Sequence, residues 1–162
     1  MKSRSSLACL LVVTSLLVTG CLYDFPLTTK PTRKVEPALL GDWVSFDKDD
    51  QKLERMSVRK LDDSTYVVAL DNDIYRAFHS DYAGVTLLSV QNLQSGGDEG
   101  KYVYYRYALA ADHEHLSLWG VSNHIVPEET KTQADAQGLI RANLNNPKLY
   151  GDEIAFTRKK PQ

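Results

Sequence analysis

The chain has 162 residues, a length suited to one globular domain. Its 19 basic and 21 acidic residues give a formal net charge of −2. This balance argues against a nucleic-acid partner, which needs a strongly basic face.

The N-terminal segment has the features of an export signal. Lys2 and Arg4 precede an apolar run at residues 7–18. This run is shorter than the roughly 20 residues of a membrane-spanning helix, as is typical of a cleaved signal peptide. Gly20 then supplies a small residue directly before Cys21.

Residues 17–21, LVTGC, resemble the lipobox of bacterial lipoproteins. The resemblance implies cleavage between Gly20 and Cys21, which removes residues 1–20. It also implies a diacylglyceryl group on the Cys21 thiol and a further acyl chain such as palmitate on its freed amine. Two or three chains make a durable anchor, whereas one chain holds only reversibly. The alternative is an ordinary secretory signal with a cysteine at this position by chance. Because Cys9 lies in the removed part, no cysteine pair remains for a disulfide.

Leu22 bears on where the anchored protein resides. In well-studied enteric lipoproteins, an aspartate directly after the lipidated cysteine retains the protein in the inner membrane. Leu22 departs from that signal, so the resemblance implies the outer membrane, with the domain facing the periplasm, rather than the inner membrane.

Residues 21–39 include three prolines among threonines and basic residues, a composition typical of an extended, solvated tether. Contact between these basic residues and lipid headgroups is the alternative.

Residues 40–160 alternate with a period of two, the mark of half-buried strands. Seven strands are expected before any helical pattern, at residues 41–46, 52–61, 65–70, 74–79, 85–93, 101–109 and 115–121. The spacing then becomes helical, at Ala136, Leu139, Ile140 and Leu144. Thr130 with Gln133 resembles a capping box at the start of this helix. A last strand is expected at residues 153–159.

We therefore predict an antiparallel up-and-down β-barrel of about eight strands, with one helix before the last strand. A β-sandwich is the alternative. Closure removes exposed sheet edges, and eight strands leave an interior that side chains fill or that holds one small ligand.

The opening strand carries a resemblance to a known group of barrels. Gly41-Asp42-Trp43 is similar to the G-x-W signature of calycins, the lipocalin and fatty-acid-binding barrels. The resemblance implies that Trp43 is buried near the closed end and that Arg158, near the last strand, packs over its ring. A helix before the final strand also resembles lipocalins.

The sequence places few residues that suit catalysis or metal binding. His113 and His115 would share one face of a strand, beside Asp112 and Glu114. A charged turn is the favoured interpretation because no third ligand is placed, so we expect neither a metal nor a cofactor. Residues 79–81, HSD, include triad residue types, but adjacent residues cannot form a triad. We therefore expect no catalysis.

The strand expected at residues 101–109 is the most aromatic part of the chain. One face reads as core, formed by Val103, Tyr105, Tyr107 and Leu109. The other face holds Tyr102, Tyr104 and Arg106, and tyrosine and arginine are enriched at binding hot spots. This second face is a candidate interaction surface, with plain strand propensity as the alternative explanation.

Together these features predict a lipid-anchored cell-envelope lipoprotein with a non-catalytic binding domain. One hypothesis is that the barrel binds a small apolar ligand. The alternative is a protein-interaction module, such as an inhibitor or an envelope-assembly accessory, that uses its aromatic strand and loops. A large apolar cavity would favour the first hypothesis, and a filled interior with an exposed aromatic patch would favour the second.

Overall fold

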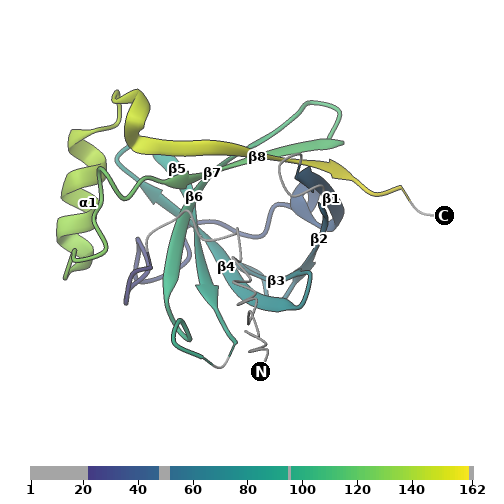
Figure 1. Ribbon diagram of the computed structural model, residues 1–162, viewed down its shortest axis with the longest axis horizontal. Coiled ribbons are helices and arrows are strands. Elements are labelled where there is room, and N and C mark those ends of the chain that lie inside the picture. Colours follow the sequence, from purple (N-terminus) through teal and green to yellow (C-terminus); the bar gives the residue numbers. More distant parts are fainter. Residues whose placement is uncertain (1–21, 48–51, 95, 161–162) are drawn as a thin grey trace, which may run out of the picture.

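Eight antiparallel strands close into a barrel in the computed structural model, which describes residues 22–47, 52–94 and 96–160 (Figure 1). Each strand pairs with the next along the chain, and β1 pairs with β8 through Trp43–Arg158 and Val44–Thr157. The predicted up-and-down barrel is therefore confirmed, and the β-sandwich alternative is wrong. The strands are β1 (Gly41–Asp47), β2 (Lys52–Lys60), β3 (Thr65–Leu70), β4 (Asp73–Tyr82), β5 (Val85–Asn92), β6 (Tyr102–Leu109), β7 (His115–Val121) and β8 (Tyr150–Arg158).

Two strands are longer than expected. β4 runs to Tyr82 because its last residues continue to pair with the start of β5, as in Tyr82–Val85. The hairpin turn is thus reduced to Ala83 and Gly84, both with positive φ, as a tight two-residue connection requires. β8 begins at Tyr150 rather than at residue 153, because Tyr150 pairs with Val121 across an irregularity in β7.

The helix α1 (Gln133–Ala142) connects β7 to β8 and lies outside the barrel (Figure 1). Its N-cap is Thr132, whose side chain accepts a hydrogen bond from the Asp135 N–H at 3.1 Å. The capping box expected at Thr130 and Gln133 is therefore wrong by two residues. The Gln133 side chain is engaged elsewhere, since its amide donates to the Pro26 carbonyl at 2.9 Å.

Residues 22–36, which we call the strap, lie along the outside of the barrel. Tyr23 forms a two-way backbone bridge with Tyr102 at the start of β6, with N···O distances of 2.8 and 2.7 Å. Tyr23 and Leu27 are buried, with exposed fractions of 1% and 0%. The expectation of a solvated tether is therefore wrong for these two residues, because they pack against apolar side chains on the outer faces of β5 and β6, namely Leu87, Tyr102 and Tyr104.

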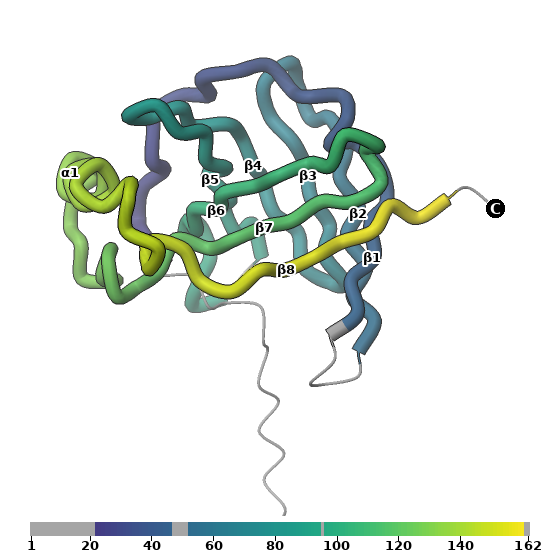
Figure 2. Tube along the Cα trace, turned by 90° about the horizontal axis from the view of Figure 1, so that it is seen from above, coloured from purple at the N-terminus to yellow at the C-terminus, as the bar shows by residue number. Residues whose placement is uncertain are grey.

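The strap continues from beside α1 over one end of the barrel, where it enters the 3₁₀ helix η1 (Pro37–Leu39) and then β1 (Figure 2). A second 3₁₀ helix, η2 (Pro147–Leu149), leads from α1 into β8. The strap and α1 are joined directly: the Gln137 amide donates to the Leu27 carbonyl at 2.8 Å.

The buried side chains form two clusters that the sheet separates. The outer core lies between the barrel, the strap and α1, and includes Tyr23, Leu27, Phe78, Leu87, Tyr102, Tyr104, Val121, Val126, Ala136, Ile140 and Leu149. The inner core lies inside the barrel and includes Leu39, Trp43, Met56, Val58, Tyr66, Ala77, Leu116 and Phe156. Both faces of part of the sheet are thus buried, which is why several strands read as apolar on both sides.

Candidate functional site

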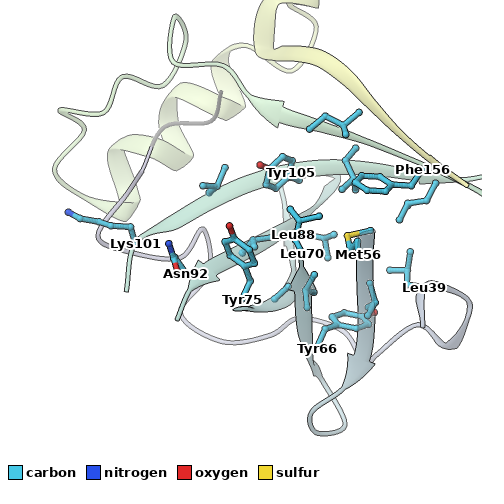
Figure 3. Close-up of a pocket in the computed structure, with 18 of the residues that line it drawn as sticks. Leu39, Met56, Tyr66, Leu70, Tyr75, Leu88, Asn92, Lys101, Tyr105 and Phe156 are labelled. Carbon is cyan, nitrogen blue, oxygen red and sulfur yellow. The ribbon is translucent and has the colours of Figure 1, made fainter. Parts of the chain in front are cut away.

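The barrel encloses an apolar cavity of about 120 Å³ (Figure 3). It is lined by side chains that alternate inward from β2 to β8, among them Met56, Val68, Leu70, Leu88, Val90, Val103, Tyr105, Leu118 and Ile154. Dry cavities lined by Leu, Ile and Phe of about 150 Å³ hold a benzene-sized molecule. The interior is therefore large enough for a small apolar group.

Small residues in the wall account for part of this space. Gly120 on β7 lies opposite Tyr105 on β6, and its position on the inner face carries no side chain. Ala77 supplies only a methyl group from β4. As a result, Leu88 and Val90 remain half-exposed toward the cavity although they lie inside a closed barrel. A ligand in the cavity would remove this remaining apolar surface from water.

One end of the cavity is closed by Trp43, Arg158 and Leu39. Trp43 has an exposed fraction of 0%, and its indole N–H donates to the Leu39 carbonyl at 3.1 Å. The guanidinium carbon of Arg158 lies 4.2 Å from the centroid of the Trp43 ring. Arg158 also donates to the carbonyls of Leu40, Ala38 and His113, at 2.8, 2.6 and 2.7 Å. The arginine thus ties η1 and the β6–β7 loop across this end.

Arg158 also explains why a glycine begins β1. Gly41 has a φ of 144°, in a region that other residues rarely adopt. A Cβ at this position would collide with the Arg158 guanidinium. The G-x-W pattern therefore has a steric basis in this chain: the glycine leaves room for the arginine that covers the tryptophan.

The opposite end forms the mouth of the cavity, lined by Leu22, Asn92, Asp98 and Lys101. Figure 3 shows Asn92 and Lys101 grouped with Tyr75 at one end, far from Leu39 at the other. Asp98 is exposed, and the Lys101 ammonium forms an ion pair with Asp24 of the strap. Polar groups are therefore concentrated at the mouth, while the wall is apolar.

Three tyrosines line the cavity, Tyr66, Tyr75 and Tyr105, and the Tyr66 hydroxyl accepts a hydrogen bond from the Glu36 N–H at 2.7 Å. Burial raises the pKa of Tyr105 to about 12. Burial and the nearby Asp73 carboxylate raise the pKa of Tyr75 to about 12 as well. Both phenols are therefore neutral at physiological pH and can donate or accept a hydrogen bond. A ligand with an apolar body and a polar end fits this distribution of side chains.

A buried histidine lies deeper, toward the closed end. His79 has an exposed fraction of 1%, and neither ring nitrogen has a hydrogen-bond partner among the described residues. Its ring lies 5.5 Å from that of Tyr66 and 5.6 Å from that of Tyr107. Burial lowers the pKa of His79, and the neighbouring Glu36 carboxylate partly offsets this effect. The HSD triplet at residues 79–81 forms no triad, and alternation with Tyr75 and Ala77 instead places His79 on their face of β4.

The candidate interaction surface on β6 is not free. Tyr102 and Tyr104 have exposed fractions of 8% and 0%. The Tyr104 ring stacks on Tyr23, with centroids 4.7 Å apart, and its hydroxyl donates to the Phe25 carbonyl at 2.7 Å. The prediction that this face is exposed is therefore wrong for both tyrosines. Period-two alternation correctly separates the two faces, but the strap covers the outer one.

Arg106, the third member of that surface, is exposed. Its guanidinium lies between two rings, 5.5 Å from the centroid of Trp119 and 5.4 Å from that of Tyr150. The two contacts hold the guanidinium on the outer face of β6–β8.

The other residues singled out in the sequence lie apart from the cavity. Gly20 and Cys21 fall outside the described residues. His113 lies in the β6–β7 turn with a φ of 58°, and His115 opens β7 with its imidazole 4.0 Å from Asp112. Within residues 22–47, 52–94 and 96–160, no group of three or more His, Cys, Asp or Glu side chains is placed to hold a metal ion. Within the same ranges, no helix has the length and apolar character needed to cross a bilayer.

Comparisons with protein-family models, with curated proteins and with solved structures find no match to this chain.

Proposed function

We propose that this chain is a lipid-anchored lipoprotein of the bacterial cell envelope, whose barrel binds a small apolar ligand without catalysis. The cavity carries the ligand part of the proposal. It combines a wall of aliphatic side chains with neutral phenols and a polar mouth, which is the usual composition of a small-molecule site. The ligand we expect is an amphiphile with a short apolar body, or one end of a longer chain.

The strand order and the contact between Trp43 and Arg158 support the proposed relationship to calycins. In this proposal Trp43 and Arg158 close one end of the barrel, and the ligand enters through the mouth at the other end. The lipobox at residues 17–21 supports the anchor at Cys21 and, with Leu22, outer-membrane residence facing the periplasm. No metal, cofactor or nucleic acid enters the proposal.

The ligand site is tested with a domain that starts at Leu22 and the benzene-sized apolar probe toluene, whose binding is followed by titration calorimetry. We expect saturable binding to one site. Val90→Phe fills the cavity from β5 and should abolish probe binding while the protein stays folded. Val67→Phe is the matched control, because Val67 lies on the outer face of β3, paired with Arg59 and Arg76. Equal binding by both variants would place the probe elsewhere and contradict the proposed site.

The anchor is tested with the full chain expressed in a bacterial envelope and labelled with an alkyne analogue of palmitate. Cys21→Ser should abolish labelling and leave the precursor uncleaved. A mutant that is processed at the same bond and remains equally membrane-bound would show that the lipobox interpretation is wrong. Fractionation of the labelled wild type then separates outer-membrane from inner-membrane residence.

The alternative, a protein-interaction module, loses most of its expected surface because the strap covers Tyr102 and Tyr104. Arg106 between Trp119 and Tyr150 is the part of that surface that stays exposed. Arg106→Ala should leave probe binding in the cavity unchanged, and a loss of probe binding would show that the two regions are not independent.

A further inference from the structure

We propose that the mouth of the cavity faces the bilayer directly, with an apolar rim in contact with the lipid headgroup region. The ligand would then enter from the membrane rather than from water. This inference rests on the proposed anchor at Cys21, and it adds an orientation, a docking surface and a source for the ligand. Two independent features of the described residues carry it.

The first feature is the place where the strap begins. Leu22 lines the mouth of the cavity, and the next residue, Tyr23, is buried and bridged to Tyr102 in both directions. The Tyr23 hydroxyl also donates to the Val126 carbonyl at 2.6 Å. Two residues of fully extended chain span at most about 7 Å. An anchor on Cys21 therefore holds the mouth within about that distance of the lipid, with no slack to turn the barrel around.

The second feature is a rim of exposed apolar side chains at the same end of the barrel. Four of the five large hydrophobic side chains that are exposed among the described residues lie there: Phe46, Leu53, Ile74 and Leu93, with exposed fractions of 59, 47, 40 and 45%. Exposed apolar groups that cluster at one place mark interaction surfaces, whereas scattered ones need no explanation. The fifth, Leu61, lies at the opposite end, just before the β2–β3 turn.

The rim consists of two apolar pairs on the strand ends at this end of the barrel. Phe46 pairs with Leu53 at the end of the β1–β2 hairpin. The Leu93 N–H donates to the Ile74 carbonyl at 3.0 Å, and Leu93 directly follows Asn92, which lines the mouth. The β1–β2 hairpin, which carries the first pair, lies beside the β3–β4 hairpin, which leads to Ile74. Lys52 at the start of β2 forms an ion pair with Asp71 between β3 and β4, at 2.8 Å. Figure 2 places the β1–β2 and β3–β4 hairpins on the same side of the barrel, opposite the strap's crossing.

Charges at this end determine which lipids the rim should favour. Two of the acidic groups are paired, in the bridges Lys52–Asp71 and Lys101–Asp24. Among the described residues, Asp73, Asp98 and Glu99 add three acidic side chains at this end, and Arg55 beside Asp71 adds one basic side chain. An acidic surface is repelled by anionic headgroups within a Debye length. The rim therefore suits a bilayer of zwitterionic lipid and is weakened by anionic lipid.

This orientation also restricts the ligand. An amphiphile that leaves the bilayer tail-first meets the apolar wall at Leu88 and Val90 while its polar end stays beside Asn92 and Lys101. The apolar part never crosses water on this route. The chemical class is therefore a membrane-resident amphiphile whose apolar end enters a cavity of about 120 Å³.

The test uses the full, lipidated chain in phosphatidylcholine vesicles. Single cysteines at Leu53→Cys or Ile74→Cys are labelled with bimane, and Leu61→Cys is the matched control of similar exposure at the opposite end. Cys21 carries lipid and Cys9 is removed, so the new thiol is the one that reacts. With nitroxide-bearing lipid as quencher, we expect severalfold stronger quenching at positions 53 and 74 than at 61, and weaker quenching after phosphatidylglycerol is added.

The outcomes separate this inference from the proposed function. A mass lacking the acyl groups, or failure to float with vesicles, would mean that the anchor itself is wrong. A lipidated protein that floats but shows equal quenching at the three positions, or stronger quenching at 61, would overturn the bilayer-facing mouth while leaving the anchor intact. Probe binding by the domain that starts at Leu22 stands independently of both results.

Discussion

The outer and inner cores of this barrel are filled to different degrees. Outside the sheet, Leu27, Leu87 and Tyr104 each have an exposed fraction of 0%. Inside it, Leu88 and Val90 stay half-exposed toward an open cavity. The difference indicates that the strap and α1 supply much of the close packing that holds the domain together. The interior is then free to leave space for a ligand.

The largest effect is expected at the closed end, where the inner core is fully packed. Trp43→Ala should reduce the free energy of unfolding by about 3–5 kcal/mol, because a buried tryptophan is replaced by a void. Urea unfolding of the domain that starts at Leu22 measures this loss. A loss below about 1 kcal/mol would show that this end is as loosely filled as the mouth.

Two neighbouring leucines allow the most direct comparison of the cores. Leu87→Ala removes a side chain from the outer core and should cost about 2–5 kcal/mol of unfolding free energy. Leu88→Ala removes the same atoms from the wall of an existing cavity, so its cost should be smaller, about 1–2 kcal/mol. Urea unfolding of both variants under one condition decides the order. Equal costs would contradict the difference in packing.

A smaller effect is expected for the guanidinium over the indole. Arg158→Ala should destabilise the domain by about 0.5–2 kcal/mol from the cation–π contact, with a further loss from its hydrogen bonds. Trp43→Leu removes the ring but keeps the site apolar. In a double-mutant cycle the two changes should not add, because the groups are 4.2 Å apart. Additivity would mean that Arg158 acts only through the carbonyls that it binds.

The smallest effect is a pH dependence that originates inside the barrel. His79 has a lowered pKa when folded, so the unfolded chain takes up the proton first as the pH falls. The stability is therefore greatest above the ordinary histidine pKa of about 6.5 and decreases below it. His79→Phe keeps a ring between Tyr66 and Tyr107 and should flatten this decrease between pH 7.5 and 5.

Unfolding free energies across that range provide the measurement. The neighbouring Asp81 does not contribute to this decrease. Its hydrogen bond with Arg33 is the main reason that its pKa is lowered to about 2, so its carboxylate stays ionised in the folded protein throughout this pH range. An unchanged pH dependence in His79→Phe would assign the decrease to other groups.

Much of the barrel could be predicted because period-two alternation and turn residues are local properties. The burial of the strap could not, since Tyr23 finds its partners at Tyr102 and Val126, far along the chain. For the same reason the alternation of β6 separated Tyr104 from Tyr105 but did not show that the strap covers Tyr104. The volume of the cavity depends on the sizes of many side chains from different strands, including the absence of a side chain at Gly120. No short sequence pattern predicts that volume.

The docking of the strap also sets an order of events during folding. Its hydrogen-bond partners lie 62 residues away at Ser89, 103 at Val126 and 110 at Gln137. Contacts this distant in sequence form late, after the hairpins of the meander. The strap therefore docks only after the strands that receive it have formed, and the burial of Tyr23 and Leu27 marks the completed barrel.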